Sequence, residues 1–179
     1  MIKIILIALA CIIVVILVIA ATKPDTFSVE RKTVMKAAAD RVFPHINDFH
    51  GWGAWSPWEK LDPALKRTFS GAASGKGTLY AWEGNSKVGS GSMEITEATP
   101  PAKIVIKLDF IKPFEGHNVT VFTLTPQGDA TEVVWTMSGP VPYLGKIMHL
   151  FFNMDRMVGG QFDSGLANLK AIVEGGAQK

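Results

Sequence analysis

The sequence predicts an α+β domain in which a curved antiparallel sheet wraps a long C-terminal helix. Apolar residues recur every three or four positions from Pro142 to Val173, which predicts one continuous amphipathic helix. Upstream, short runs of alternating apolar and polar residues are separated by Gly, Pro, Asn and Asp, which predicts strands joined by turns. A long helix with one apolar stripe needs a broad apolar surface to lie on, and a curved sheet supplies it.

The N-terminal stretch is a separate element. Residues 4–21 are apolar and uncharged, and as a helix they reach about 27 Å, close to the ~30 Å hydrocarbon core of a bilayer. We therefore expect a transmembrane anchor at residues 1–23 and a linker at residues 24–26. The alternative is a cleaved signal peptide, with Ala20 and Ala21 near the cut. The run is longer than the ~7–15 residues of a signal h-region, and the region before it has a single basic side chain, Lys3, which favours the anchor.

Composition restricts the partners. The remaining ~155 residues suit one domain with a real core. The formal charge is +2 with both signs interspersed, so we expect no nucleic-acid partner. Cys11 is the only cysteine, which excludes an internal disulfide and a cysteine metal site. We expect no metal and no cofactor, and a single-pass protein of the bacterial cell membrane whose orientation the flanking charges leave open.

The first part of the domain combines a strand, a short helix and a tryptophan cluster. Residues 26–35 are rich in β-branched residues and predict a strand, and Asp40 is the expected N-cap of a helix that ends near His50. Three tryptophans follow within seven residues: Trp52, Trp55 and Trp58. They either pack in the core at the end of the sheet, or line a ligand cavity, or lie at a membrane interface.

Six further strands are expected at residues 65–70, 78–83, 91–97, 103–110, 118–125 and 131–138. Alternation places one face of each strand inward. The large side chains on these inward faces are Tyr80, Trp82, Met93, Ile106, Phe110, Phe122 and Trp135.

The C-terminal helix has two unlike halves. Residues 144–158 are apolar nearly all round, so this half is either buried on several sides or presents a second apolar surface to a ligand, lipid or partner. Gly159-Gly160 permits a kink or a close approach of the helix to the sheet. Gly175-Gly176 is the expected end of the helix.

The ordered set of motifs resembles a known superfamily. It includes residues 37–48 (AAADRVFPHIND), Trp55-Ser-Pro-Trp58-Glu, residues 77–85 (GTLYAWEGN), residues 131–135 (TEVVW) and residues 165–170 (GLANLK). Together they resemble the START/Bet v 1-like superfamily in its polyketide cyclase/dehydrase-like (SRPBCC) branch. The resemblance implies a helix-grip fold over residues 27–176, in which two short helices close one end and a hydrophobic ligand occupies a cavity between sheet and helix.

Our leading hypothesis is a membrane-anchored binding or carrier domain for a hydrophobic small molecule or lipid. We expect the cavity to be lined by some of the following residues of the sheet, the tryptophan cluster and the C-terminal helix: Trp55, Tyr80, Trp82, Met93, Ile106, Phe110, Phe122, Trp135, Met148, Phe152 and Phe162. One alternative is an enzyme of the cyclase/dehydratase type, with His45, Asp48 or Tyr80 as acid–base candidates, although the scattered histidines suit surface roles equally. Another is a non-catalytic regulator that binds a protein partner.

Overall fold

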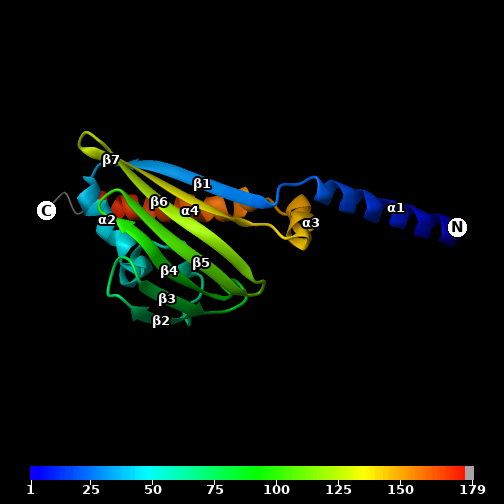
Figure 1. The fold of residues 1–179 in the computed structure, drawn as a ribbon, viewed down its shortest axis with the longest axis horizontal. Coiled ribbons are helices and arrows are strands. Elements are labelled where there is room, and N and C mark those ends of the chain that lie inside the picture. The colour runs from blue at the N-terminus through cyan, green and yellow to red at the C-terminus, as the bar shows by residue number, and fades with distance from the viewer. Residues whose placement is uncertain (176–179) are drawn as a thin grey trace.

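The computed structural model of the protein describes residues 1–175. An N-terminal helix projects from an α+β domain (Figure 1). The elements in chain order are α1 (Ile2–Ala21), β1 (Thr26–Met35), α2 (Ala39–Asn47), the short 3₁₀ helices η1 (Phe49–Ala54) and η2 (Pro57–Lys60), β2 (Lys66–Gly71), β3 (Thr78–Glu83), β4 (Ser90–Thr99), β5 (Lys103–Lys112), β6 (Gly116–Gln127), β7 (Ala130–Pro140), α3 (Tyr143–Phe151) and α4 (Met154–Gly175). The expected α+β architecture is confirmed.

The seven strands form one antiparallel sheet in the order β1-β7-β6-β5-β4-β3-β2. Its strands alternate as the sequence predicts: Ile104, Ile106 and Leu108 of β5 are buried, whereas Lys107 between them is exposed. The pairing of β4 with β5 shifts register twice, and such bulges increase the bend and twist of a sheet. The sheet therefore has a concave inner face that a helix can occupy.

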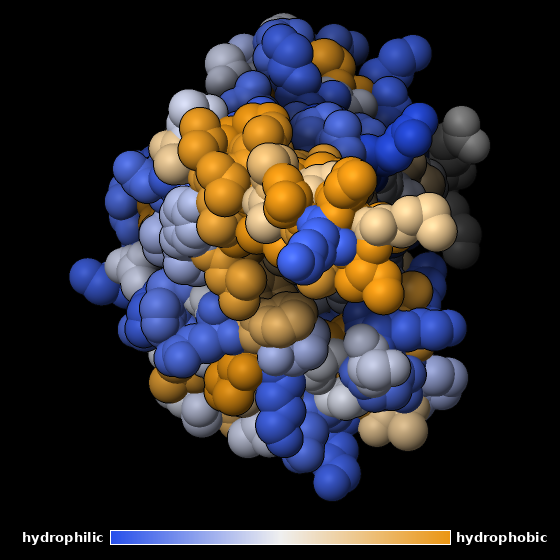
Figure 2. Space-filling model, turned by 90° about the vertical axis from the view of Figure 1, so that its right-hand side faces the viewer, coloured by the Kyte–Doolittle hydropathy of each residue, from blue (hydrophilic) through white to orange (hydrophobic). Residues whose placement is uncertain are grey.

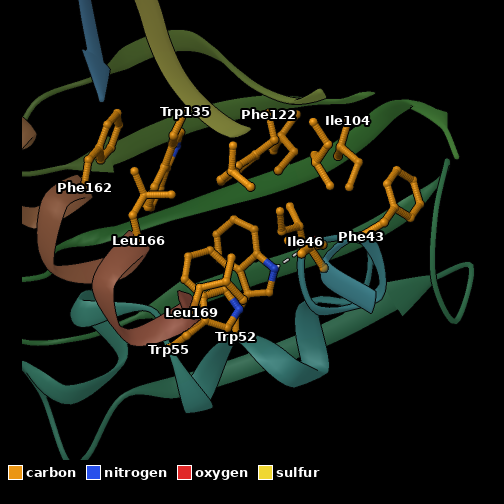
Figure 3. Packing of buried hydrophobic residues seen from close by; sticks show 14 of the residues in the cluster. Phe43, Ile46, Trp52, Trp55, Ile104, Phe122, Trp135, Phe162, Leu166 and Leu169 are labelled. Carbon is orange, nitrogen blue, oxygen red and sulfur yellow. Dashed lines mark hydrogen bonds between the residues drawn. The ribbon is translucent and has the colours of Figure 1, made fainter. Parts of the chain in front are cut away.

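Helix α4 lies along that inner face (Figure 1). Its buried side chains are spaced by three or four residues: Phe162, Leu166, Leu169 and Val173. Figure 3 shows three of them opposite Trp135 and Phe122 of the sheet, with Trp52 and Trp55 closing the same core. The helix comes close to the sheet at Gly165, where a Cβ atom would lie 2.9 Å from the Trp135 ring.

The prediction of one helix from Pro142 to Val173 is wrong, because the helix is interrupted between α3 and α4. Phe152 has an extended backbone (φ −119°, ψ 125°), and the Asn153 side chain accepts a hydrogen bond from the backbone N–H of Arg156 at 2.9 Å. Asparagine at this position satisfies a free N–H of the next helix, which favours a new start there. The predicted Asp40 N-cap is also displaced: α2 begins at Ala39, and Asp40 lies in its first turn.

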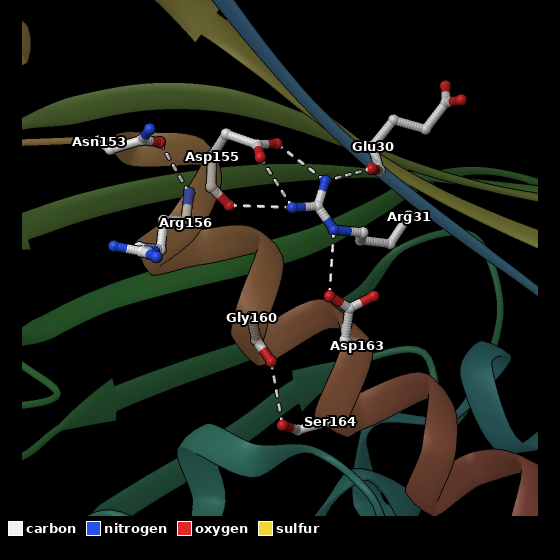
Figure 4. Close-up of polar contacts among 8 residues, drawn as sticks. All are labelled: Glu30, Arg31, Asn153, Asp155, Arg156, Gly160, Asp163 and Ser164. Atoms are coloured by element: carbon white, nitrogen blue, oxygen red, sulfur yellow. Dashed lines mark hydrogen bonds and ion pairs between the residues drawn. The ribbon is translucent and has the colours of Figure 1, made fainter.

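Gly159 leaves room for an ion-pair cluster between β1 and α4, formed by Arg31, Asp155 and Asp163 and called the clamp below. Helix α4 continues through Gly159-Gly160. The guanidinium of Arg31 binds both carboxylate oxygens of Asp155, at 2.8 and 2.9 Å, and one oxygen of Asp163 at 3.1 Å (Figure 4). A Cβ atom on Gly159 would collide with this guanidinium. The hydrogen bonds from Arg31 hold the pKa of the Asp155 carboxyl below its usual range. Helix α4 is described as far as Gly175, and Gly176, the second residue of the expected Gly175-Gly176 end, lies outside the described residues.

Helix α1 extends away from the domain, and Ala20 is its one buried residue (Figure 1). Its mean hydropathy of 3.6 and length of 20 residues are sufficient to cross a membrane, and no other helix within residues 1–175 has both properties. By the same measure it also fits a signal sequence. Because only 6% of this stretch is buried, α1 is not a core helix of the domain.

Candidate functional site

A cavity of about 150 Å³ lies between the inner face of the sheet and the first half of α4. Its wall is mostly apolar and aromatic. The lining residues are Trp52, Ser56, Trp58, Glu59, Leu65, Tyr80, Trp82, Val88, Met93, Leu108, Phe110, Thr120, Trp135, Met137, Val158 and Phe162. A cavity of this volume with an apolar wall accommodates a benzene-sized group.

The tryptophan cluster contributes to both the core and the cavity. The indole N–H groups of Trp52 and Trp55 donate to the carbonyls of Ile46 and His45 in the last turn of α2, each at 3.0 Å. These bonds satisfy carbonyls that the end of a helix leaves free. Trp55 is fully buried and outside the cavity, whereas Trp52 and the half-buried Trp58 line it. Packing and cavity lining are therefore divided among the three residues.

Aromatic stacking shapes the two walls. On the helix side, the rings of Trp135 and Phe162 are nearly parallel, with centroids 4.0 Å apart. On the opposite side, Tyr80 stacks with Trp82 at 6.0 Å, and the edge of Trp82 meets Phe110 at 5.8 Å. The two groups come from β3, β5, β7 and α4, so the cavity depends on how the sheet curves around the helix.

Two polar side chains of the wall, Glu59 of η2 and Tyr80 of β3, form a network with Arg67 of β2, which lies outside the lining. One oxygen of the Glu59 carboxylate accepts a hydrogen bond from the Tyr80 hydroxyl at 2.5 Å, and the other pairs with Arg67 Nε at 2.6 Å. The Glu59 side chain is only 8% exposed. Burial of Tyr80, together with its bond to Glu59, raises the pKa of the phenol above its usual range. The phenol therefore remains a proton donor to Glu59, and the bond to Glu59 likewise raises the pKa of Arg67.

The structure brings together six of the eleven residues predicted to line the cavity: Tyr80, Trp82, Met93, Phe110, Trp135 and Phe162. Trp55, Ile106 and Phe122 lie deeper, in the fully packed part of the core. Met148 and Phe152 are 41% and 50% exposed and lie outside the cavity, because α3 turns away from the sheet instead of continuing α4. These two candidates are therefore not among the lining residues.

The acid–base candidates are divided in the same way. Tyr80 lines the cavity, but His45 and Asp48 do not. Asp48 instead binds the Nδ1 atom and the backbone N–H of His50, both through one oxygen, at 2.8 and 2.9 Å. Within residues 1–175, no three His, Cys, Asp or Glu side chains are grouped as metal ligands.

Several lining residues were not predicted. Leu108, Thr120 and Met137 lie on the inward faces that alternation predicts, but alternation alone does not distinguish the cavity wall from the packed core. Glu59 directly follows Trp58, and a carboxylate beside a dense aromatic cluster was an available signal. Val158 lies one turn before Phe162 on the predicted apolar stripe, so helical spacing could have added it to the lining.

Comparison with known proteins identifies the fold and the family. The chain resembles a Chromobacterium violaceum protein, CV1439, with 18% identity, a TM-score of 0.57, and coverage of 85% of this chain and 99% of that one. It also resembles the di-domain ARO/CYC protein StfQ from the steffimycin biosynthetic pathway (14% identity, TM-score 0.63, 86% and 52% coverage) and major latex-like protein 151 from Panax ginseng (11% identity, TM-score 0.60, 84% and 99% coverage).

These identities establish a shared fold and nothing more specific, and a search of curated proteins found no match. A family model described as polyketide cyclase/dehydrase and lipid transport matches residues 26–174. The helix-grip fold inferred from the sequence is confirmed. The chain belongs to the polyketide cyclase/dehydrase and lipid transport family.

Proposed function

We propose that this protein is a membrane-anchored domain that binds a hydrophobic small molecule in the cavity between the sheet and α4. In this proposal residues 1–23 anchor the chain, residues 24–26 link it, and the domain begins at residue 27. The observation that carries the proposal is the cavity itself: about 150 Å³, with an aromatic wall and one buried polar network. Binding sites for small molecules have this combination of apolar walls and few polar groups.

The volume restricts the ligand. Cavities that hold drug-sized molecules measure roughly 300–1,000 Å³, whereas this one measures about 150 Å³. A small aromatic compound, or the terminal group of a longer molecule, therefore fits better than a whole lipid. The Glu59–Tyr80 pair lies in the wall, where it favours a ligand that carries one hydroxyl or other hydrogen-bonding group.

The test is extraction of the full chain, purified in detergent, followed by mass spectrometry. Val158 lines the cavity, whereas its neighbour Met157 is 57% exposed. Val158→Phe is expected to fill the cavity and release no bound compound, while the wild type and the control Met157→Phe release the same apolar compound. Release of equal amounts by all three proteins, or by none, would contradict the proposal.

A second candidate function is an enzyme of the cyclase/dehydratase type, because two ionisable side chains, Glu59 and Tyr80, line the cavity. General acid–base catalysis requires such groups within reach of the substrate. If the domain is catalytic, the ligand recovered after incubation differs from the ligand added, in mass where water is lost or in chromatographic retention where cyclisation gives an isomer, and Glu59→Gln abolishes the change. Unchanged ligand would refute catalysis while leaving binding intact.

A further inference from the structure

Helix α3 is attached to the last turns of α1. The Tyr143 hydroxyl donates a hydrogen bond to the Leu17 carbonyl at 2.7 Å. Lys146, which is 7% exposed, pairs with Asp25 in the segment that follows α1, at 2.5 Å. The backbone of Asp25 also accepts a hydrogen bond from the N–H of Val141 at 2.7 Å. These contacts fix the direction in which α1 leaves the domain, and they place α3 beside its C-terminal end (Figure 1).

The same end of the molecule exposes large apolar side chains. On α3 and the start of α4, the exposed fractions are 68% for Leu144, 66% for Phe151, 50% for Phe152 and 57% for Met157. The end of β5 and the turn that follows it add two more, Ile111 at 61% and Phe114 at 72%. This turn lies at the same end of the sheet, because the start of β6 pairs with the end of β7, from which α3 follows.

Figure 2 faces this end of the molecule and shows hydrophobic surface gathered over it, part of which belongs to α1. Soluble monomers rarely expose several neighbouring side chains of this size, and such patches mark sites of interaction. The sequence left open whether residues 144–158 are buried or form a second apolar surface. The structure assigns most of them to a surface.

The position of the surface relative to α1 identifies its partner as a lipid bilayer. Leu17, which α3 contacts, lies four residues before the end of α1 at Ala21, or about 6 Å along the helix axis. If α1 crosses a bilayer, this level is where the hydrocarbon core meets the headgroups. Interfacial helices lie with their apolar face about 5–10 Å into that boundary, where tyrosine is also enriched.

We propose that α3, the first turn of α4 and the β5–β6 turn form a membrane-docking surface that sits in the headgroup layer of the bilayer crossed by α1. The inference rests on the anchoring role of α1 in the proposed function. It also connects membrane and cavity: Met157 belongs to the docking surface, and the next residue, Val158, lines the cavity. The docking surface and the binding site of a hydrophobic ligand therefore adjoin each other on α4.

The test uses the full chain in vesicles of phosphatidylcholine and phosphatidylglycerol. A fluorophore is attached either to native Cys11, which is exposed on α1, or to a single introduced cysteine in a Cys11→Ser background. The test position is Phe151→Cys. The control is Ala171→Cys, an exposed site near the C-terminal end of α4 and far from the docking surface. Lipids that carry a doxyl quencher near the headgroup, or deep in the acyl chain, report the depth of each fluorophore.

The expected result is loss of fluorescence at Phe151→Cys with headgroup-level quenchers, loss at Cys11 with deep quenchers, and no loss at Ala171→Cys. Quenching at Cys11 without quenching at Phe151→Cys would overturn the docking surface and leave the anchor intact. No quenching at Cys11 would overturn the anchor, and the docking surface with it. A fluorophore at Phe151→Cys that is shielded from aqueous iodide but unaffected by doxyl lipids would instead show that a protein covers this surface, which also overturns the proposal.

Discussion

Two buried tryptophans in the core differ in their hydrogen bonding. Trp52 and Trp135 are 4% and 2% exposed. The indole N–H of Trp52 donates to the Ile46 carbonyl at 3.0 Å, whereas the N–H of Trp135 has no acceptor among residues 1–175. Replacing either residue with Phe removes the same atoms. The two variants therefore isolate the contribution of one buried hydrogen bond.

Trp52→Phe leaves the Ile46 carbonyl unpaired, and an unpaired buried acceptor costs about 1–3 kcal/mol. Trp135→Phe removes a donor that is already unpaired and carries no such cost. The loss of ring burial is common to both variants. We therefore expect Trp52→Phe to reduce the free energy of unfolding by about 1–3 kcal/mol more than Trp135→Phe does.

Urea unfolding of the full chain in detergent, followed by far-ultraviolet circular dichroism, measures this difference without relying on tryptophan emission. The denaturant dependence of the two variants should be equal, so that midpoints compare directly. Equal stability of the two variants, or lower stability of Trp135→Phe, would refute the assignment of the hydrogen bonds.

Three further predictions concern the clamp and the polar network. In Gly160→Ala the added Cβ contacts no other residue, so the variant should stabilise α4 by about 0.8–1 kcal/mol. In Gly159→Ala the added Cβ displaces Arg31, so this variant should be the less stable of the two in thermal unfolding. Equal stabilities of the two variants would contradict the clamp. The lowered pKa of Asp155 means that its contribution to stability is present above the ordinary carboxyl pKa near ~4 and is lost as pH falls through the lowered value. The stability difference between wild type and Asp155→Asn should therefore be constant near neutral pH and shrink in acid; a difference independent of pH would argue against the ion pair. The raised pKa of Tyr80 means that its contribution to stability is present below the ordinary phenol pKa of ~10 and is lost as pH rises through the raised value. The part of the tyrosinate absorbance that the wild type shows and Tyr80→Phe lacks should therefore develop only at a pH above the ordinary phenol pKa.

The strands were predictable because their signal is local. The strands expected at residues 26–35 and 78–83 are observed with those bounds, and the other five differ at their ends by at most two residues. Alternation correctly placed Ile104, Ile106 and Phe122 on the buried face. Each of these inferences needs only the two-residue period of a strand and the residues that end it.

The division of the C-terminal segment was not predicted, because apolar periodicity continues across the break at Phe152. Residues of α3 keep helical spacing, but their side chains are directed to a surface that the domain does not cover. A sequence with one apolar stripe does not reveal whether the stripe faces the sheet or a bilayer. The capping residue Asn153 was the local signal for the break.

The sequence could predict which side chains face inward, but not which of these inward side chains line the cavity. Ile106 and Leu108 are both inward residues of β5, yet only Leu108 lines the cavity. The difference arises because part of the inner face is covered by α2 and the tryptophan cluster, and the alternation of a strand carries no information on what covers it. The contact between Glu59 and Tyr80 likewise joins residues 21 positions apart.

Entry of a hydrophobic molecule into this cavity can be measured by the fluorescence of the protein's own tryptophans. Four of its five tryptophans line the cavity: Trp52, Trp58, Trp82 and Trp135. Bromobenzene, a heavy-atom quencher of about the size that a 150 Å³ cavity accepts, can be titrated against the full chain in nanodiscs. Binding in the cavity predicts saturable quenching of tryptophan emission in the wild type and in Met157→Phe, and only weak, non-saturable quenching in Val158→Phe. Identical quenching curves for all three proteins would contradict it.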